Sequence, residues 1–157
     1  MTLSKKSRRA VPEVKIDMET RAPIERVWET VIAIERYQDS MDTVRSVRIV
    51  KEIDERRRRA AWSVLLKGSI LEWEEEEHLD HDTHTVVFKQ LRGDLEHFDG
   101  HWALEALGPK QTRVVFEVVF EIGIPMLAEM LNPVAQRSLQ ENCTEMLRGI
   151  ERTAASG

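Results

Sequence analysis

The chain has a single cysteine, Cys143, and no long apolar run. One cysteine rules out an internal disulfide framework and fits a reducing compartment, so we expect a cytoplasmic protein. No apolar stretch approaches the roughly 20 residues that a membrane-spanning helix needs. The formal net charge is −5, so the chain also lacks the basic surplus that would favour nucleic acid as a partner.

The start of the chain is basic but lacks the apolar core of a secretion signal. We expect a disordered arm over residues 1–12, with weak electrostatic attraction to an acidic partner or anionic lipid as the alternative role. A length of 157 residues suits one domain, expected over residues 13–154. No phosphate-binding loop or dinucleotide fingerprint occurs in the sequence, so no cofactor is implied.

The apolar pattern predicts a strand, one or two helices, six more strands and a long final helix. Alternation predicts the first strand from Glu13 to Thr20, and Ala22-Pro23 then opens a helix with an apolar stripe. The final helix is expected from about residue 124 to 153, kinked or divided at Pro133. Because turn residues link them closely, the six strands must be antiparallel neighbours. They are predicted at about 44–53, 57–67, 70–80, 84–92, 95–107 and 111–122.

The segment Leu71 to Leu79, LEWEEEEHL, is the most informative stretch of the chain. Successive side chains of a strand point to opposite faces, so four glutamates in a row cannot all face water. If Leu71, Trp73 and Leu79 define the apolar face, Glu75 and Glu77 share it. A buried carboxylate must be paired, protonated or hydrated, because burying it alone is costly. We therefore expect this sheet to line a cavity.

Several segments together resemble those of a known superfamily. They are Ala22 to Trp28, Leu71-Glu72-Trp73, Gly100-His101-Trp102, Thr112 to Glu121, and the helix from Asn132 to Ile150. In this order, over about residues 13–152, they resemble the START-like (helix-grip, Bet v 1-like, SRPBCC) superfamily, and within it the polyketide cyclase/dehydrase-like branch. The resemblance implies an α+β START-like ligand-binding domain. Its curved antiparallel sheet of about seven strands would surround a long C-terminal helix and leave a pocket for a large hydrophobic molecule.

The chain differs from the aromatic polyketide aromatases at two cavity positions. Those enzymes carry an arginine and a tyrosine in the cavity, whereas alignment puts Glu77 at the arginine position and Val44 near the tyrosine position. Their aldol cyclisation and dehydration therefore cannot simply be carried over. Related domains include lipid carriers and self-resistance proteins of enediyne producers, so the fold alone does not choose between these activities.

Glu77 and Glu75 are the candidate catalytic residues. If Gly68-Ser69 is a two-residue hairpin turn, Ala60 faces Glu77 and Arg58 lies on its diagonal. Arg58 then either neutralises Glu77 near the cavity rim, or a bulge exposes Glu77. In the functional alternative, one of the two glutamates has a raised pKa. It acts as general acid or base on a bound poly-β-ketone, or donates a hydrogen bond to a ligand carbonyl.

Aromatic and adaptable side chains are expected to contact the ligand, because core and pocket wall are the same layer in this fold. Gln90 is a candidate neutral hydrogen-bonding partner in the pocket, and Gly100 leaves room for a ligand or marks a bulge. The expected ligand-binding residues are Trp28, Trp62, Trp73, Phe88, Gln90, Phe98, Gly100, Trp102, Phe116, Phe120, Met126 and Met130.

Other polar clusters carry weaker signals. His78, His81 and His84 match no strong metal pattern, so we expect an exposed polar hairpin and no metal site. The run Arg56 to Arg59 either steers an acidic acyl carrier protein or serves solubility alone. Cys143 is expected to be a buried small hydrophobe, since no sequence feature supplies it with a base.

The sequence thus predicts a domain that binds a large hydrophobic molecule, polyketide-derived or isoprenoid-like, in an internal cavity. The leading hypothesis is a polyketide cyclase/aromatase-like protein of antibiotic or other natural-product biosynthesis. The alternative is a non-catalytic binder, either a self-resistance protein that sequesters a reactive metabolite such as an enediyne, or an isoprenoid or lipid carrier. Polar groups deep in the pocket would favour catalysis, and glutamates at its rim would favour the binder.

Overall fold

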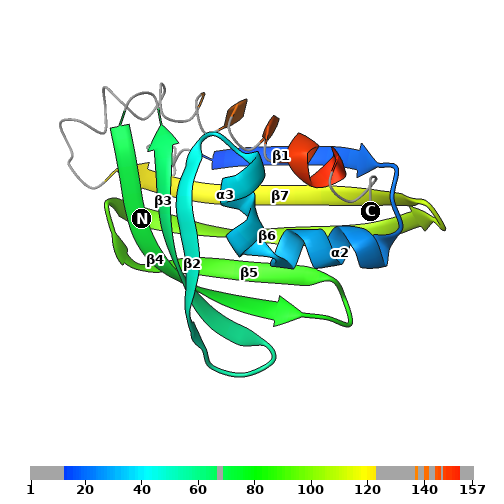
Figure 1. The fold of residues 1–157 in the computed structure, drawn as a ribbon, viewed down its shortest axis with the longest axis horizontal. Coiled ribbons are helices and arrows are strands. Elements are labelled where there is room, and N and C mark those ends of the chain that lie inside the picture. The colour runs from blue at the N-terminus through cyan, green and yellow to red at the C-terminus, as the bar shows by residue number, and fades with distance from the viewer. Residues whose placement is uncertain are drawn as a thin grey trace, which may run out of the picture.

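The computed structural model describes residues 13–66 and 69–122, together with residues 137, 140, 141, 144, 145 and 147–152. Within these residues one antiparallel sheet of seven strands has the order β1-β7-β6-β5-β4-β3-β2. Figure 1 shows its strong curvature. The strands are β1 (Glu13–Thr20), β2 (Val44–Glu52), β3 (Arg57–Leu66), β4 (Ser69–Asp80), β5 (Thr85–Gly93), β6 (Leu95–Gly108) and β7 (Gln111–Ile122). The predicted sheet is confirmed.

The connection between β1 and β2 is helical. It comprises α2 (Ile24–Ile32), the 3-10 turn η1 (Ile34–Arg36) and α3 (Tyr37–Ser40). Pro23 is the N-cap of α2, where its missing N–H costs nothing, and its carbonyl accepts the Val27 amide at 3.1 Å. Figure 1 shows α2 and α3 crossing one face of the sheet.

The described residues near the C-terminus are helical, and they pack into the same core as α2. Residues 147–152 form its continuous described part, and Leu147 and Ile150 are fully buried. They share one apolar cluster with Val27 and Val31 of α2 and with the inner face of the sheet. This arrangement is the helix-grip fold. The predicted kink at Pro133, the basic arm over residues 1–12 and the burial of Cys143 lie outside the described residues.

The register of β3 on β4 differs from the prediction by two residues. Leu66 pairs with Ser69, and Arg58 lies directly opposite Glu77 instead of on its diagonal. Ala60 therefore faces Glu75. Because side chains alternate with a period of two, this slip keeps every residue on its predicted face while changing its neighbour. None of the helices within the described residues is long and apolar enough to cross a membrane.

Candidate functional site

A cavity of about 80 Å³, partly open to solvent, lies between the concave face of the sheet and the segment from α2 to β2. Most of its wall is apolar, and its charged wall residues come from the neighbouring strands β3 and β4. The described lining residues are Val31, Ile34, Tyr37, Thr43, Val44, Arg58, Trp62, Val64, Trp73, Glu75, Glu77, Val86, Phe88, Phe98, Trp102 and Phe116. The space is narrow, so a large ligand has to move wall side chains.

Aromatic rings form a continuous part of this wall. Trp62 and Trp73, opposite each other on β3 and β4, stack with centroids 5.9 Å apart and planes 7° apart. Trp73 contacts Phe98 at 4.7 Å, and the series continues through Phe88 to Phe116 and Trp102. Rings at these separations pack favourably. They give the cavity flat, polarisable surfaces suited to conjugated or aromatic molecules.

Arg58 and Glu77 form a buried ion pair in the cavity wall. The Nε of Arg58 donates to Oε1 of Glu77 at 2.7 Å, and its terminal N–H donates to the Ile32 carbonyl at 2.8 Å. Glu77 is 3% exposed and Arg58 is 9% exposed. Such a pair is tolerated in a core because geometry and additional hydrogen bonds offset the loss of hydration. Arg58 thus joins the C-terminal end of α2 to the Glu77 carboxyl group of β4.

Glu75 lies beside this pair and is 3% exposed. Burial raises its pKa well above the usual value, and the neighbouring Glu77 raises the pKa further through a hydrogen bond and through its negative charge. Trp73 donates its indole N–H to Oε1 of Glu75 at 2.8 Å, which acts in the opposite direction. Glu75 therefore holds its proton more tightly than an exposed glutamate does, and it lies next to the carboxyl group that Arg58 pairs.

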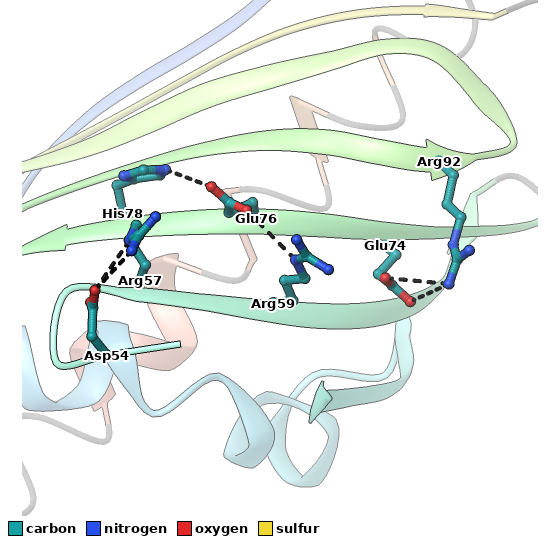
Figure 2. A network of polar contacts seen from close by, with 7 residues as sticks. All are labelled: Asp54, Arg57, Arg59, Glu74, Glu76, His78 and Arg92. Atoms are coloured by element: carbon teal, nitrogen blue, oxygen red, sulfur yellow. Dashed lines mark hydrogen bonds and ion pairs between the residues drawn. The ribbon is translucent and has the colours of Figure 1, made fainter. Parts of the chain in front are cut away.

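The outward residues of β4 have a different environment. Figure 2 shows Glu74, Glu76 and His78 on the outer face, each with partners near the strand. Glu76 lies 2.9 Å from His78 and 3.6 Å from Arg59, and these contacts lower its pKa, the hydrogen bond to His78 most of all. Alternation along one strand thus separates three outward polar side chains from two buried carboxyl groups.

Tyr37 is a cavity residue that no sequence pattern singled out. It is the chain's only tyrosine and is 3% exposed. Its hydroxyl donates to the Val31 carbonyl, and its ring contacts Trp62 edge-on at 6.0 Å. Burial raises its pKa, and the charge of Glu77 adds to this effect. The cavity therefore contains an arginine and a tyrosine, although not at the two positions that the alignment compared.

The structure brings together only some of the predicted ligand-binding residues. Those on the cavity wall are Trp62, Trp73, Phe88, Phe98, Trp102 and Phe116. Trp28 lies outside the described wall and donates its indole N–H to Nδ1 of His81 at 3.2 Å. Phe120 is buried in the core and is also absent from the wall. Met126 and Met130 lie outside the described residues.

Gln90 and Gly100 have structural surroundings that the sequence did not reveal. Gln90 is opposite Glu75 across β4 and β5, but its amide donates to the Leu95 carbonyl and it does not line the cavity. Gly100 sits opposite Phe88, in unbroken register. A Cβ there would come within 2.5 Å of the Phe88 ring. The missing side chain therefore makes room for the ring of Phe88, which in turn lines the cavity. A ligand contact at Gly100 stays a prediction.

The histidine series does not converge within the described residues. His81 contacts Trp28 and the Glu55 carbonyl, while His84 lies 3.4 Å from Glu25 and His78 faces outward to Glu76. No group of three or more ligating side chains in the described part of the chain is arranged to hold a metal ion.

Comparison with known proteins defines the class. Residues 20–147 match the family described as "Polyketide cyclase / dehydrase and lipid transport", so the chain belongs to that family. The search of curated proteins finds no match.

Among solved structures, the protein TTHA0849 from Thermus thermophilus is 29% identical, with a TM-score of 0.85 over 92% of this chain and 98% of that chain. The Zhui aromatase/cyclase from Streptomyces sp. R1128 is 20% identical, with a TM-score of 0.85 over 93% and 94%. A START superfamily protein from Mycobacterium smegmatis is 16% identical, with a TM-score of 0.76 over 92% and 97%. At 20% and 16% identity, the similarities to the Zhui aromatase/cyclase and to the Mycobacterium smegmatis protein show a shared fold only.

Proposed function

We propose that this protein binds a large hydrophobic molecule, polyketide-derived, in the cavity and acts on it as a cyclase or dehydrase of natural-product biosynthesis. The observation that carries the proposal is the buried group formed by Glu75, Glu77 and Arg58. A pocket used only for carriage gains nothing from two carboxyl groups placed among tryptophans, since their burial is costly. The same residues in an active site supply acid–base chemistry.

The two carboxyl groups are suited to complementary roles. Neutral Glu75 holds a proton that a general acid can give to a departing hydroxyl group, which leaves as water. Glu77, paired with Arg58, offers an oxygen that can take the proton from the neighbouring carbon. Together these transfers balance the dehydration of a β-hydroxy ketone, and they require no cofactor. Two neighbouring groups with different protonation are a common acid–base arrangement.

The second candidate is a non-catalytic binder, a lipid or isoprenoid carrier or a sequestering resistance protein. The largely apolar remainder of the wall supports it, and the family description includes lipid transport. Under this hypothesis Arg58 and the glutamates only orient a ligand.

The run Arg56 to Arg59 gives little support for an acyl carrier protein as a partner. These arginines already contact acidic side chains of the protein itself, which are Asp82, Asp54, Glu77 and Glu76 respectively. The proposal also includes the cytoplasmic location that the sequence predicts.

The test begins with the ligand. Native mass spectrometry of protein purified from its own host, followed by extraction, identifies any bound molecule. Turnover of its precursor is then compared between wild type, Glu75→Gln and the outer-face control Glu76→Gln. We expect the Glu75 variant to lose at least about a hundredfold in kcat and the Glu76 variant to keep wild-type kcat. Full turnover by Glu75→Gln would refute catalysis by this group, and a bound phospholipid or quinone would favour the carrier.

A further inference from the structure

We propose that the cavity selects uncharged, flat ligands that carry an oxygen acceptor, and that the indole N–H of Trp62 anchors this oxygen beside the glutamates. The proposal rests on the proposed function, since it concerns the same cavity. It adds the chemical class of the ligand and a residue that determines specificity.

The charges in the described cavity wall are already matched. Arg58 directs Nε to Glu77 and its terminal N–H to the Ile32 carbonyl, so these donors are committed to the protein. The other acidic or basic side chains on the described wall are the carboxyl groups of Glu75 and Glu77. A carboxylate ligand would meet carboxyl groups without a free cation to balance it. Since unpaired charges are strongly disfavoured in such surroundings, fatty acids and other anions should bind poorly.

Trp62 provides a donor that makes no hydrogen bond of normal geometry within the described residues. Its indole nitrogen is buried and has no hydrogen-bond partner among the described residues. The indole N–H lies near Glu75 and lowers the pKa of that carboxyl group, against the effect of burial. The two groups nevertheless do not form a hydrogen bond of normal geometry. A buried N–H without an acceptor is unfavourable. A ligand oxygen that reaches it removes this cost and gains affinity.

The surroundings of this donor favour a flat ligand. Trp62 stacks on Trp73, and its ring also meets Tyr37 edge-on, so the N–H belongs to the edge of an aromatic wall. A conjugated ketone or quinone-like molecule can lie along this wall and direct its oxygen to the indole. Simple alkanes lack the oxygen, and phospholipids carry a charge that the cavity does not match.

Three naphthalene probes of one shape class separate these effects: β-ethylnaphthalene, β-acetylnaphthalene and β-naphthoate. Isothermal titration calorimetry near neutral pH measures each on wild type, Trp62→Phe and the control Trp28→Phe, whose indole lies outside the described wall. We expect wild type to bind the ketone about tenfold more tightly than the ethyl probe and the carboxylate more weakly than the ketone. In Trp62→Phe the ketone should bind no more tightly than the ethyl probe, while Trp28→Phe should keep the wild-type ratio of the two affinities.

The outcomes distinguish this proposal from the proposed function. If wild type binds the ethyl probe but shows no ketone advantage, or binds the carboxylate most tightly, the specificity proposal is overturned and hydrophobic binding stands. If none of the probes binds, both are overturned. If Trp62→Phe still binds the ketone more tightly than the ethyl probe, another residue is the donor, and the proposal is also overturned. Should Trp62→Phe not fold, the indole N–H resonance of Trp62 in wild type serves instead. It must shift downfield with the ketone and not with the ethyl probe.

Discussion

Arg58 and Glu77 lie directly opposite each other on β3 and β4, with 2.7 Å between the guanidinium Nε and the carboxylate Oε1. The pair stands in the cavity wall, where water is largely excluded from both groups. A second carboxyl group, Glu75, shares this space. The stability of the sheet and the chemistry of the cavity therefore depend on the same residues.

Removal of Arg58 alone should destabilise the protein. In Arg58→Ala the Glu77 carboxylate stays buried without a partner, and we expect the free energy of unfolding to fall by about 3–5 kcal/mol. The double variant Arg58→Met/Glu77→Leu removes both charges and should recover most of this loss. Urea unfolding measures all variants. Arg57→Ala, which breaks an exposed pair with Asp54, is the control and should cost no more than about 1 kcal/mol.

The opposite ranking would contradict the ion-pair account. If the double variant is less stable than Arg58→Ala, packing of the long side chains matters more than charge. If Arg57→Ala costs as much as Arg58→Ala, burial does not distinguish the two arginines.

The raised pKa of Glu75 predicts a pH dependence of stability. Above the ordinary value of 4.5 the unfolded chain releases this proton while the folded protein keeps it. The folded state then binds more protons, so the contribution of Glu75 to the free energy of unfolding falls as pH rises, until the raised pKa is passed. One proton accounts for at most about 1.4 kcal/mol per pH unit.

Glu75→Gln isolates this effect, because glutamine keeps the shape and does not titrate. We expect the stability of Glu75→Gln relative to wild type to increase with pH between mildly acidic and mildly basic conditions. Urea unfolding of both proteins across this range gives the difference directly. A difference that stays constant, or that decreases with pH, would mean that Glu75 is ionised in the folded protein.

Gly100 should not tolerate a side chain. A Cβ at this position would lie 2.3 Å from the Glu117 carbonyl and 2.5 Å from the Phe88 ring. We expect Gly100→Ala to lower the free energy of unfolding by about 1–3 kcal/mol, as overpacking typically does. Gly108→Ala is the matched control on the same strand, since nothing lies within 4 Å of its added Cβ. Thermal unfolding that affects both glycine variants equally would refute this role of Gly100.

The inward direction of Glu75 and Glu77 could be predicted because it depends on alternation alone. Leu71, Trp73 and Leu79 determine which face is apolar, and a strand preserves that assignment along its length. The neighbours of the glutamates were harder to predict, since register depends on where the turn falls. With Leu66 paired to Ser69, each residue of β4 meets a partner two positions away from the predicted one.

Contacts made through the helical connection could not be read from strand patterns. Tyr37 reaches the cavity from α3, and Arg58 contacts the Ile32 carbonyl at the end of α2. Both depend on how α2 and α3 cross the sheet, which local periodicity does not specify. The hydrogen-bond partner of Trp28 was equally hidden from the sequence. The place of Trp28 on the apolar stripe of α2 was apparent, but the hydrogen bond to His81 was not.

The most direct test of the account is occupancy of the cavity. Native mass spectrometry of wild type from its own host is compared with Thr43→Trp, in which a large side chain would fill space at a wall residue between α3 and β2. We predict that wild type carries an uncharged aromatic or polyene molecule and that Thr43→Trp, folded by circular dichroism, is empty. A ligand that binds both proteins equally would contradict the account, because it would place the binding site outside the cavity that Glu75 and Glu77 line.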